Sequence, residues 1–176
     1  MSNIGPEEIR IEKLSKEHDI TGFQSYEKEL VKFLKEDALD NQDKRISMTY
    51  LWFLKETNEL IGYFTLLNDK ITLKGNLEQF FKDKNITYST LPSLKIARLA
   101  VDNRFLRKGI GTLMIEYIVR RAKSISIKIA GCRFVTVDAK KNSILFYQKN
   151  EFQILREGKE DTVFMHLDVT RQILQS

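Results

Sequence analysis

The segment best suited to chemistry is a basic, glycine-containing run, Arg107-Lys108-Gly109-Ile110-Gly111-Thr112, which opens a predicted helix. The first backbone amides of a helix have no intrahelical acceptor, and the helix dipole favours negative charge there. Two glycines let an anion approach the backbone, and the Arg and Lys side chains add positive charge. The run predicts a pyrophosphate cradle, although a glycine-eased helix start with solvated basic residues explains it equally well.

Two better-known phosphate-binding loops do not fit this run. A Walker A loop needs Gly-x-x-x-x-Gly-Lys followed by Ser or Thr, which is absent here. The dinucleotide fingerprint needs a third glycine where this chain has Met114. That fingerprint also places its glycines directly after a strand, whereas residues 102–108 intervene here. A nicotinamide cofactor is therefore not expected.

The elements that must position the run follow from hydrophobic periodicity. The predicted strands are Ile9–Leu14, Met48–Leu54, Leu60–Leu67, Leu94–Val101, Phe134–Ala139 and Thr162–Asp168. The predicted helices are one capped by Ser25 with the apolar face Tyr26, Leu30, Phe33, Leu34 and Ala38, a long one over Gly109–Ser126, and a short one over Ser143–Lys149. Residues 68–93 are the least regular, with a brief helix around Leu77–Lys82 and an end at Pro92. This order predicts an α/β mixed sheet covered by helices.

Composition limits the class of protein. The chain has 176 residues, of which 42% are hydrophobic and 30% charged, so we expect one domain over residues 1–176. The net charge of +5 suits an anionic partner without choosing one. No apolar run has the length of a signal or membrane segment, which predicts a cytoplasmic protein. With one cysteine, Cys132, and two distant histidines, His18 and His166, we expect no metal site.

Two landmarks in the second half carry a family resemblance. The run IARLAVDNRFLRKGIGTLMIEYI resembles the acetyl-CoA-binding motif of the GNAT N-acetyltransferase superfamily. About forty residues later, VDAKKNSILFYQKNEF resembles the second landmark of that family, a strand, an Asn and a helix carrying Phe-Tyr. Both occur in the right order, and residues 94–152 are identified as the acetyl-CoA-binding half. The resemblance implies a single-domain GNAT fold, with a mostly antiparallel central sheet, a parallel splayed strand pair and flanking helices.

The resemblance also implies roles for individual residues. The strand end at Leu99, Ala100 and Val101 would offer backbone groups to the pantetheine arm and the thioester carbonyl. Arg107, Lys108, Gly109, Ile110, Gly111 and Thr112 would hold the pyrophosphate of acetyl-CoA. Asn142 would contact the pantetheine or adenosine end, and Tyr147 would protonate the departing thiolate as the catalytic residue.

Each side chain has a structural alternative. Tyr147 can pack on Phe146 only, Asn142 can be a helix N-cap, and Asp138 is expected to be a solvated carboxylate at a strand end. The family pattern also has departures. Leu106 stands where the family usually has Gln or Arg, and Glu151 stands where it favours Gly, so that Asn150 is expected to take the left-handed turn.

The function implied is transfer of an acetyl group from acetyl-CoA to a primary amine, by direct attack in a ternary complex. The acceptor stays open among a small molecule, a peptide and an aminoacyl-tRNA. The FLKEDA and LIGYFTLLNDKI segments resemble a bacterial branch that includes aminoacyl-tRNA-acetylating toxins, which raises the alternative of a toxin with an antitoxin partner. A non-catalytic module of GNAT fold that binds CoA or a partner protein is a further alternative, and a homodimer stays open.

Overall fold

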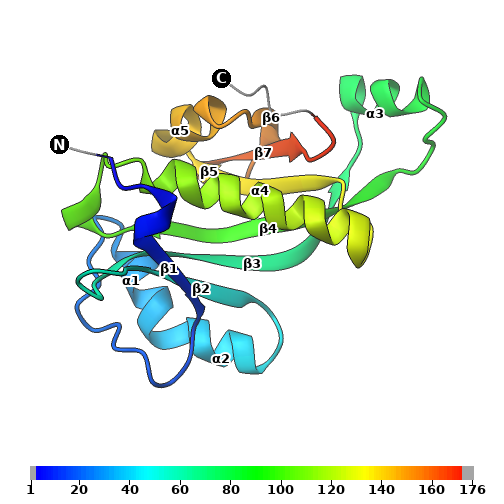
Figure 1. Cartoon of the computed structure of the whole chain (residues 1–176). Helices are drawn as coiled ribbons and strands as arrows, with labels where there is room; N and C mark the ends of the chain where they lie inside the picture. Colours follow the sequence, from blue (N-terminus) through cyan, green and yellow to red (C-terminus); the bar gives the residue numbers. More distant parts are fainter. Residues whose placement is uncertain (1–2, 172–176) are drawn as a thin grey trace. The chain divides into compact units, whose positions relative to one another are not determined.

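The computed structural model describes residues 3–171, and Figure 1 labels its helices and strands. The described residues divide into two compact units. Unit 1 comprises residues 3–67 and 96–117, and unit 2 comprises residues 68–95 and 118–171. Strands β3 (Leu60–Thr72) and β4 (Thr90–Val101) and helix α4 (Ile110–Lys128) each contribute to both units. Each unit is described below by itself.

Unit 1 is a short antiparallel sheet with a helix on each face. It contains the turn η1 (Pro6–Glu8), β1 (Ile9–Lys13), α1 (Lys28–Lys32), η2 (Phe33–Asp37), α2 (Ala38–Asp43), β2 (Met48–Leu54), the first part of β3, the end of β4, η3 (Asn103–Phe105) and the start of α4. Strand β1 pairs with β2, and β2 pairs with β3 as a hairpin. The hairpin forms because polar residues 55–59 separate two apolar runs.

The alternation of side chains along β2 assigns its two faces. Leu51 and Phe53 point to one face and join the cluster that covers the α1–α2 side. Trp52 points to the other face, where its ring meets Tyr117 of α4 edge-on, with ring centroids 5.9 Å apart. The start of α4 therefore lies on the face of the sheet opposite to α1 and α2.

The predicted first helix is correct in its core and wrong at its start. Helix α1 begins at Lys28, and Ser25 is not its N-cap. Tyr26, expected on the apolar face, is 81% exposed. The reason is tertiary, since the amide of Tyr26 donates to the side chain of Asn103 (3.1 Å) and Tyr26 stays outside the helix. Residues 28–43 then form one continuous helix with a π-helical turn at η2.

Unit 2 contains a mixed sheet with an antiparallel edge. Its elements are the end of β3, α3 (Gly75–Lys82), the start of β4, the rest of α4, β5 (Phe134–Lys140), η4 (Lys141–Ser143), α5 (Ile144–Lys149), β6 (Gln153–Glu157) and β7 (Thr162–Asp168). Strand β5 pairs with β7 without a shift, and β6 pairs with β7 with one bulge. The aromatic side chains Phe81, Phe134 and Phe164 form the centre of one core cluster.

Two sequence expectations in unit 2 are corrected. Pro92 does not end the irregular region, because β4 already begins at Thr90. The strand tolerates Pro92 because its carbonyl, and not the missing N–H, makes the hydrogen bond: it accepts the amide of Arg133 (2.8 Å). Strand β6 is absent from the prediction because its side chains are mostly exposed and do not alternate; its pairing with β7 defines it.

The strand order is β1-β2-β3-β4-β5-β7-β6, with β4 and β5 as the one parallel pair, joined through α4. The expected mixed α/β sheet, mostly antiparallel and flanked by helices, is confirmed. Within residues 3–171, every helix is too short or too polar to cross a lipid bilayer.

Candidate active site

The loop that follows β4 in unit 1 is organised by a buried carboxylate. Asp102 is fully buried, and its oxygens accept hydrogen bonds from the amides of Gln24 (2.9 Å) and Arg104 (3.0 Å). The guanidinium of Arg104 donates to the same carboxylate (2.8 Å). Burial raises the pKa of Asp102, but the hydrogen bonds from Arg104 and Gln24 outweigh burial and hold that pKa below its ordinary value. Asp102 is therefore a charged hub that fixes the loop leading to the cradle.

The cradle, residues 107–112, has a backbone suited to an anion. Arg107 and Gly109 both have left-handed backbones, with φ of 60° and 79°. The first helical hydrogen bond of α4 runs from the amide of Leu113 to the carbonyl of Gly109 (3.1 Å). The amides of residues 110–112 precede that bond and lack an intrahelical acceptor. Among residues 3–171, these three amides have no acceptor, and they stand at the positive end of a helix of 19 residues.

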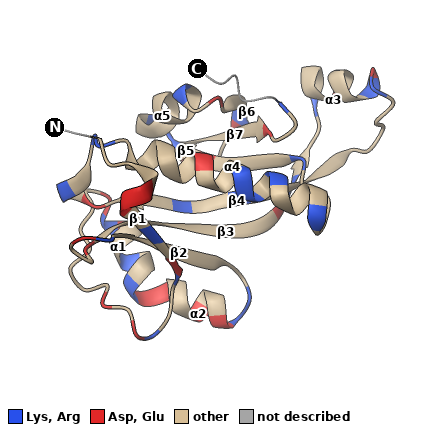
Figure 2. Cartoon of the chain, viewed as in Figure 1, with Lys and Arg blue, Asp and Glu red and all other residues tan. Residues whose placement is uncertain are grey.

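Two cations flank these amides. Arg107 is exposed, whereas Lys108 is half-buried with its ammonium 5.2 Å from the ring centroid of Phe105. Phe105 is itself buried and also contacts the guanidinium of Arg104. Figure 2 shows Lys and Arg on the loop before α4 and along α4. The cradle therefore combines backbone donors with full positive charge, which is the chemistry that a pyrophosphate requires.

The end of β4 precedes this loop in the same unit. Ala100 is buried, while Leu99 and Val101 are half-buried. The amide of Asp102 donates to the carbonyl of Ile61 (2.9 Å), so the pairing of β4 with β3 continues to the start of the loop. The three predicted strand-end residues and the six cradle residues thus belong to one continuous segment of unit 1.

Tyr147 lies in unit 2, in an aromatic cluster. Its ring meets Phe146 and Phe152 edge-on, with ring centroids 5.0 and 5.3 Å away. The residue is 6% exposed, and burial raises the pKa of its phenol. The phenol therefore keeps its proton throughout the neutral range, so it can serve as a donor. The contact with Phe146, given as the structural alternative, exists. Among residues 3–171 the hydroxyl makes no hydrogen bond, so it can still serve as a donor to a ligand.

The turn after α5 explains how Tyr147 is held. The amide of Glu151 donates to the carbonyl of Gln148, and the amide of Phe152 donates to the carbonyl of Tyr147, both at 3.0 Å. These two bonds and the Tyr147–Phe152 ring contact form a Schellman motif, which needs a left-handed residue. That residue is Glu151, with φ of 67°; the expectation that Asn150 takes this turn is wrong. Asn150 instead donates from its side chain to the carbonyl of Phe146 (2.8 Å).

Asn142 is exposed in the turn η4 and accepts a hydrogen bond from the Ser143 hydroxyl (3.2 Å). The expectation that it caps α5 is wrong, because the helix begins at Ile144 and Ser143 precedes it. Leu106, which stands where the GNAT pattern usually has Gln or Arg, is 40% exposed.

Two further groups, the carboxylate of Asp138 and the thiol of Cys132, have structural partners. The carboxylate of Asp138 pairs with Lys95 (2.6 Å), which also reaches Asp69 (3.7 Å), so Asp138 is ion-paired rather than simply solvated. Cys132 is buried, burial raises the pKa of its thiol, and its Sγ donates to the carbonyl of Phe134 (3.6 Å). Burial and a raised pKa are features of a packed thiol and not of a nucleophile.

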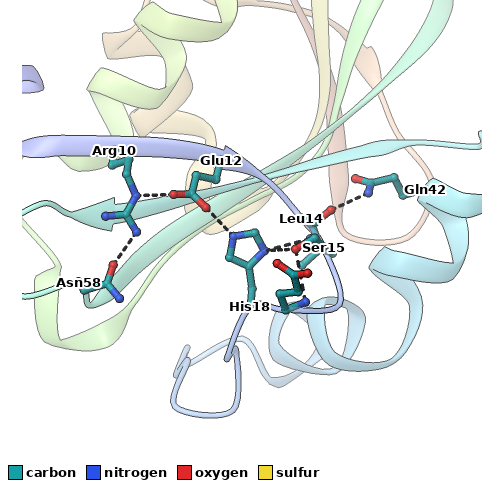
Figure 3. Close-up of polar contacts among 8 residues, drawn as sticks. Arg10, Glu12, Leu14, Ser15, His18, Gln42 and Asn58 are labelled. Carbon is teal, nitrogen blue, oxygen red and sulfur yellow. Dashed lines mark hydrogen bonds and ion pairs between the residues drawn. The ribbon is translucent and has the colours of Figure 1, made fainter.

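His18 lies in a polar network near the amino end (Figure 3). Its Nε2 is 2.7 Å from the carboxylate of Glu12, and its Nδ1 is 3.0 Å from the hydroxyl of Ser15. The order Ser15, His18, Glu12 resembles the hydroxyl, imidazole and carboxylate of a catalytic triad. However, Nδ1 also accepts the amide of Ser15 (3.0 Å), so the imidazole closes a local turn. Within residues 3–171, no group of three His, Cys, Asp or Glu side chains is arranged to hold a metal ion.

Residues 47–154 match the family model described as the acetyltransferase (GNAT) domain. The chain belongs to the GNAT acetyltransferase family. The match covers both landmarks, that is, the strand, loop and helix of residues 94–128 and the strand, Asn and helix of residues 134–149. This GNAT acetyltransferase therefore transfers an acetyl group from acetyl-CoA to an amine.

Solved structures resemble the GNAT chain over nearly its whole length. A tyrosine-to-phenylalanine mutant of KacT is 26% identical, with a TM-score of 0.76 over 89% of this chain and 94% of that one. AtaT complexed with acetyl-methionyl-tRNAfMet is 23% identical, with a TM-score of 0.77 over 89% and 93%. A mutant of the AtaT toxin bound to the C-terminus of the antitoxin AtaR and acetyl-CoA is 20% identical, with a TM-score of 0.71 over 90% and 93%.

Proposed function

We propose that this GNAT acetyltransferase acetylates the α-amine of an aminoacyl-tRNA and acts as the toxin of a toxin–antitoxin pair. The observation that carries the proposal is the similarity, along 89% of the chain, to AtaT in complex with acetyl-methionyl-tRNAfMet. The antitoxin-bound AtaT structures support a protein partner of the same kind. A cytoplasmic location and one domain over residues 1–176 accompany this proposal, and a homodimer stays a prediction.

We propose a role in acetyl-CoA binding or turnover for residues of each unit, taken by itself. In unit 1, the amides and cations of residues 107–112 bind the pyrophosphate, and the backbone of Leu99, Ala100 and Val101 receives the pantetheine arm. In unit 2, Asn142 contacts the cofactor and Tyr147 donates a proton. The free amides at the start of α4 and the protonated state of Tyr147 support this assignment.

The reaction is a direct transfer. The amine nitrogen attacks the thioester carbonyl carbon, a C–N bond forms, and the C–S bond breaks. A backbone amide at the end of β4 stabilises the oxyanion of the tetrahedral intermediate. The amine proton leaves to water, and the CoA thiolate takes the proton of Tyr147, which is restored from solvent. An α-amine has a pKa of about 8 against about 10.4 for lysine, so it loses its proton near neutral pH without a strong base.

A shallow groove in unit 1 supports an RNA acceptor. It runs beside α1 and is lined by three lysines, Lys28, Lys32 and Lys35, against the two glutamates Glu29 and Glu36. Lys32 pairs with Glu36 (3.8 Å), and Lys35 donates to the carbonyl of Thr21 (2.8 Å). Among residues 3–171, Lys28 has no ion pair, which leaves its ammonium for a phosphate group.

The decisive experiment compares acceptors. Labelled acetyl-CoA is offered with charged tRNA, uncharged tRNA, a polyamine or a peptide, and label is expected on the charged tRNA only. Efficient acetylation of the polyamine or peptide with none on charged tRNA contradicts the proposal. Expression without a partner is expected to arrest growth, and normal growth with an active enzyme would argue against the toxin role.

The groove is tested separately. The Lys28→Ala and Lys32→Ala double variant is expected to lower kcat/KM for charged tRNA by about tenfold and to reduce its salt dependence. The matched control is Lys16→Ala, an exposed lysine of the same unit outside the groove. Equal activity of both variants on charged tRNA would exclude the groove as the RNA contact.

A further inference from the structure

Unit 2 contains a cavity whose lining includes none of the residues proposed for acetyl transfer. We name it the β7 cavity. It has a volume of about 610 Å³ and lies between residues 72–80, strand β6 and the end of β7. Its lining includes Lys74, Asn76, Phe80, Arg156, His166 and Arg171. A volume of this size suits a small organic ligand.

The β7 cavity is separate from the aromatic cluster of Tyr147. Phe134, the first residue of β5, lines the cavity, whereas η4 and α5 follow Lys140 at the other end of the strand. Six residues of extended chain separate these ends by about 20 Å. The cavity is therefore not part of the environment of Tyr147.

The lining is cationic. Among residues 3–171, Lys74, Arg156 and Arg171 have no ion pair with a carboxylate. The carboxylate in the lining, Asp168, is already neutralised by Arg133, whose Nε and Nη2 donate to its two oxygens at 2.9 and 2.8 Å. Three uncompensated cations therefore face the cavity, and an anion is the ligand that they favour.

One of these cations is pre-oriented. The guanidinium of Arg156 lies over the ring of Phe164, 4.5 Å from its centroid. Stacking occupies the face of a guanidinium and leaves its N–H groups in the plane for a bidentate contact with a phosphate. Arg171 also extends along β6, with its Nη2 3.4 Å from the side-chain oxygen of Gln153.

The start of α3 adds backbone donors. Lys74 is the N-cap residue and its side chain makes no capping hydrogen bond, while Gly75 and Asn76 line the cavity. The first helical bond runs from the amide of Glu78 to the carbonyl of Lys74 (3.4 Å), so the preceding amides lack an intrahelical acceptor. The positive end of the helix therefore contributes to the same lining as the cations.

His166 supplies the second, independent sign of a ligand. It lines the cavity, is only 5% exposed, and its Nδ1 is buried without a hydrogen-bond partner among the described residues. Burial, with the charge of Arg171, lowers the pKa of His166, so the ring is neutral at pH 7. A neutral imidazole accepts a hydrogen bond, and a ligand hydroxyl would supply one.

An apolar surface completes the site. Phe80 is 46% exposed and Ile154 is 48% exposed, and both line the cavity. An exposed aromatic ring beside cations is the usual surface for stacking a nucleobase. Phosphate, hydroxyl and planar base are together the parts of a ribonucleotide.

We propose that the β7 cavity binds a ribonucleoside phosphate, with the phosphate at Lys74, Arg156 and the start of α3, and the base at Phe80. The ligand is either a free nucleotide or one nucleotide of an RNA strand. Only the RNA source depends on the proposed aminoacyl-tRNA substrate.

Calorimetric titration of the full chain tests the site with four probes: adenosine monophosphate, adenosine, inorganic phosphate and a short single-stranded RNA. Binding of the mononucleotide indicates the free-nucleotide source, and binding of RNA without the mononucleotide indicates the RNA source. No binding of either at millimolar concentration overturns the proposal. Equal affinity for inorganic phosphate and mononucleotide also overturns it, because the base would then contribute nothing.

Variants locate the binding. Arg156→Ala and Lys74→Ala are each expected to weaken binding by about tenfold, and Phe80→Leu to weaken the mononucleotide but not inorganic phosphate. The matched control Lys159→Ala removes an exposed charge outside the cavity and should bind as the unaltered chain does. Unchanged affinity in Arg156→Ala would overturn the assignment. Retained acetyl-CoA binding in each variant shows that the chain is folded, and failure of the acceptor assay above leaves this test unaffected.

Discussion

The carbonyl oxygen of Ala100 lies 2.7 Å from the position that a Cβ would take on Gly62. The terminal methyl of Met114, on α4, lies 2.5 Å from the same position. Side-chain Cβ atoms are not found this close to backbone oxygens, so only glycine allows β3, β4 and α4 to approach here. Gly62 thereby sets the position of the strand end that is proposed to receive the pantetheine arm.

Gly62→Ala is expected to lower the free energy of unfolding by about 1–3 kcal/mol through overpacking. Because the backbone at Ala100 must move, the affinity for acetyl-CoA should fall as well. Urea denaturation and calorimetric titration measure the two effects. Gly131→Ala is the control, since its nearest atom is a ring carbon of Pro92 at 3.5 Å, an ordinary contact. Wild-type stability and affinity in Gly62→Ala would contradict the steric argument.

Tyr147→Phe is expected to lower kcat by about 10²–10⁴-fold, because it removes the proton donor and keeps the ring. Acetyl-CoA affinity should change little, since the contacts with Phe146 and Phe152 remain. Steady-state kinetics and titration separate the two quantities. Tyr88→Phe, at a 73% exposed tyrosine of the same unit, is the matched control. Full turnover in Tyr147→Phe would remove its proposed role.

Asp102 predicts an acid-dependent stability. The pKa of Asp102 is lowered on folding. Its contribution to the free energy of unfolding is therefore fully present above the unfolded-state pKa near 3.8, and it is lost as the pH falls through the lower folded-state pKa. Asp102→Asn is expected to cost about 2 kcal/mol at pH 7, because charged hydrogen bonds to Arg104 and Gln24 are weakened. The difference between wild type and variant, measured by urea denaturation, should shrink below pH 4. A difference that grows towards low pH would reverse the sign and refute this account.

Glu151→Gly is expected to stabilise the chain by about 1 kcal/mol, because a left-handed backbone is strained for a residue with a Cβ. The hydrogen bonds of the Schellman motif use backbone atoms and should persist, so kcat should stay at the wild-type value. Thermal unfolding measures the gain. Lys149→Gly, inside helix α5, should instead destabilise by a similar amount. A lower melting temperature for Glu151→Gly would show that its side chain has a role of its own.

The strands and helices with strong periodicity could be predicted from sequence, and β2 and β7 have the predicted bounds. The start of α1 could not, because hydrogen bonds to Asp102 and Asn103, far along the chain, hold residues 24–26 outside the helix. Strand β6 could not either, since an exposed edge strand has no hydrophobic alternation and depends on its partner.

The candidate site shows the same division. The glycines and basic residues of the cradle are visible as a local pattern, and the structure has the helix start that the pattern predicts. The left-handed backbone at Arg107 and Gly109 is not part of that prediction. The sequence pattern alone does not predict that Gly62 and Asp102 position the site. A lone glycine within an apolar strand is nevertheless a known sign of close backbone approach. The roles of Asn142 and Tyr147 in acetyl transfer stay predictions.

Two residues other than glycine, Arg107 and Glu151, have a left-handed backbone beside the proposed functional elements. Replacing each by glycine has different consequences. At Glu151 the strain accompanies a turn that uses only backbone atoms, so a designer can relieve it freely. At Arg107 a glycine would relieve similar strain, about 1–2 kcal/mol, but would also remove a cation from the proposed pyrophosphate site. A screen that selects variants by melting temperature alone would therefore favour Arg107→Gly. The more stable variant would have a lower affinity for acetyl-CoA.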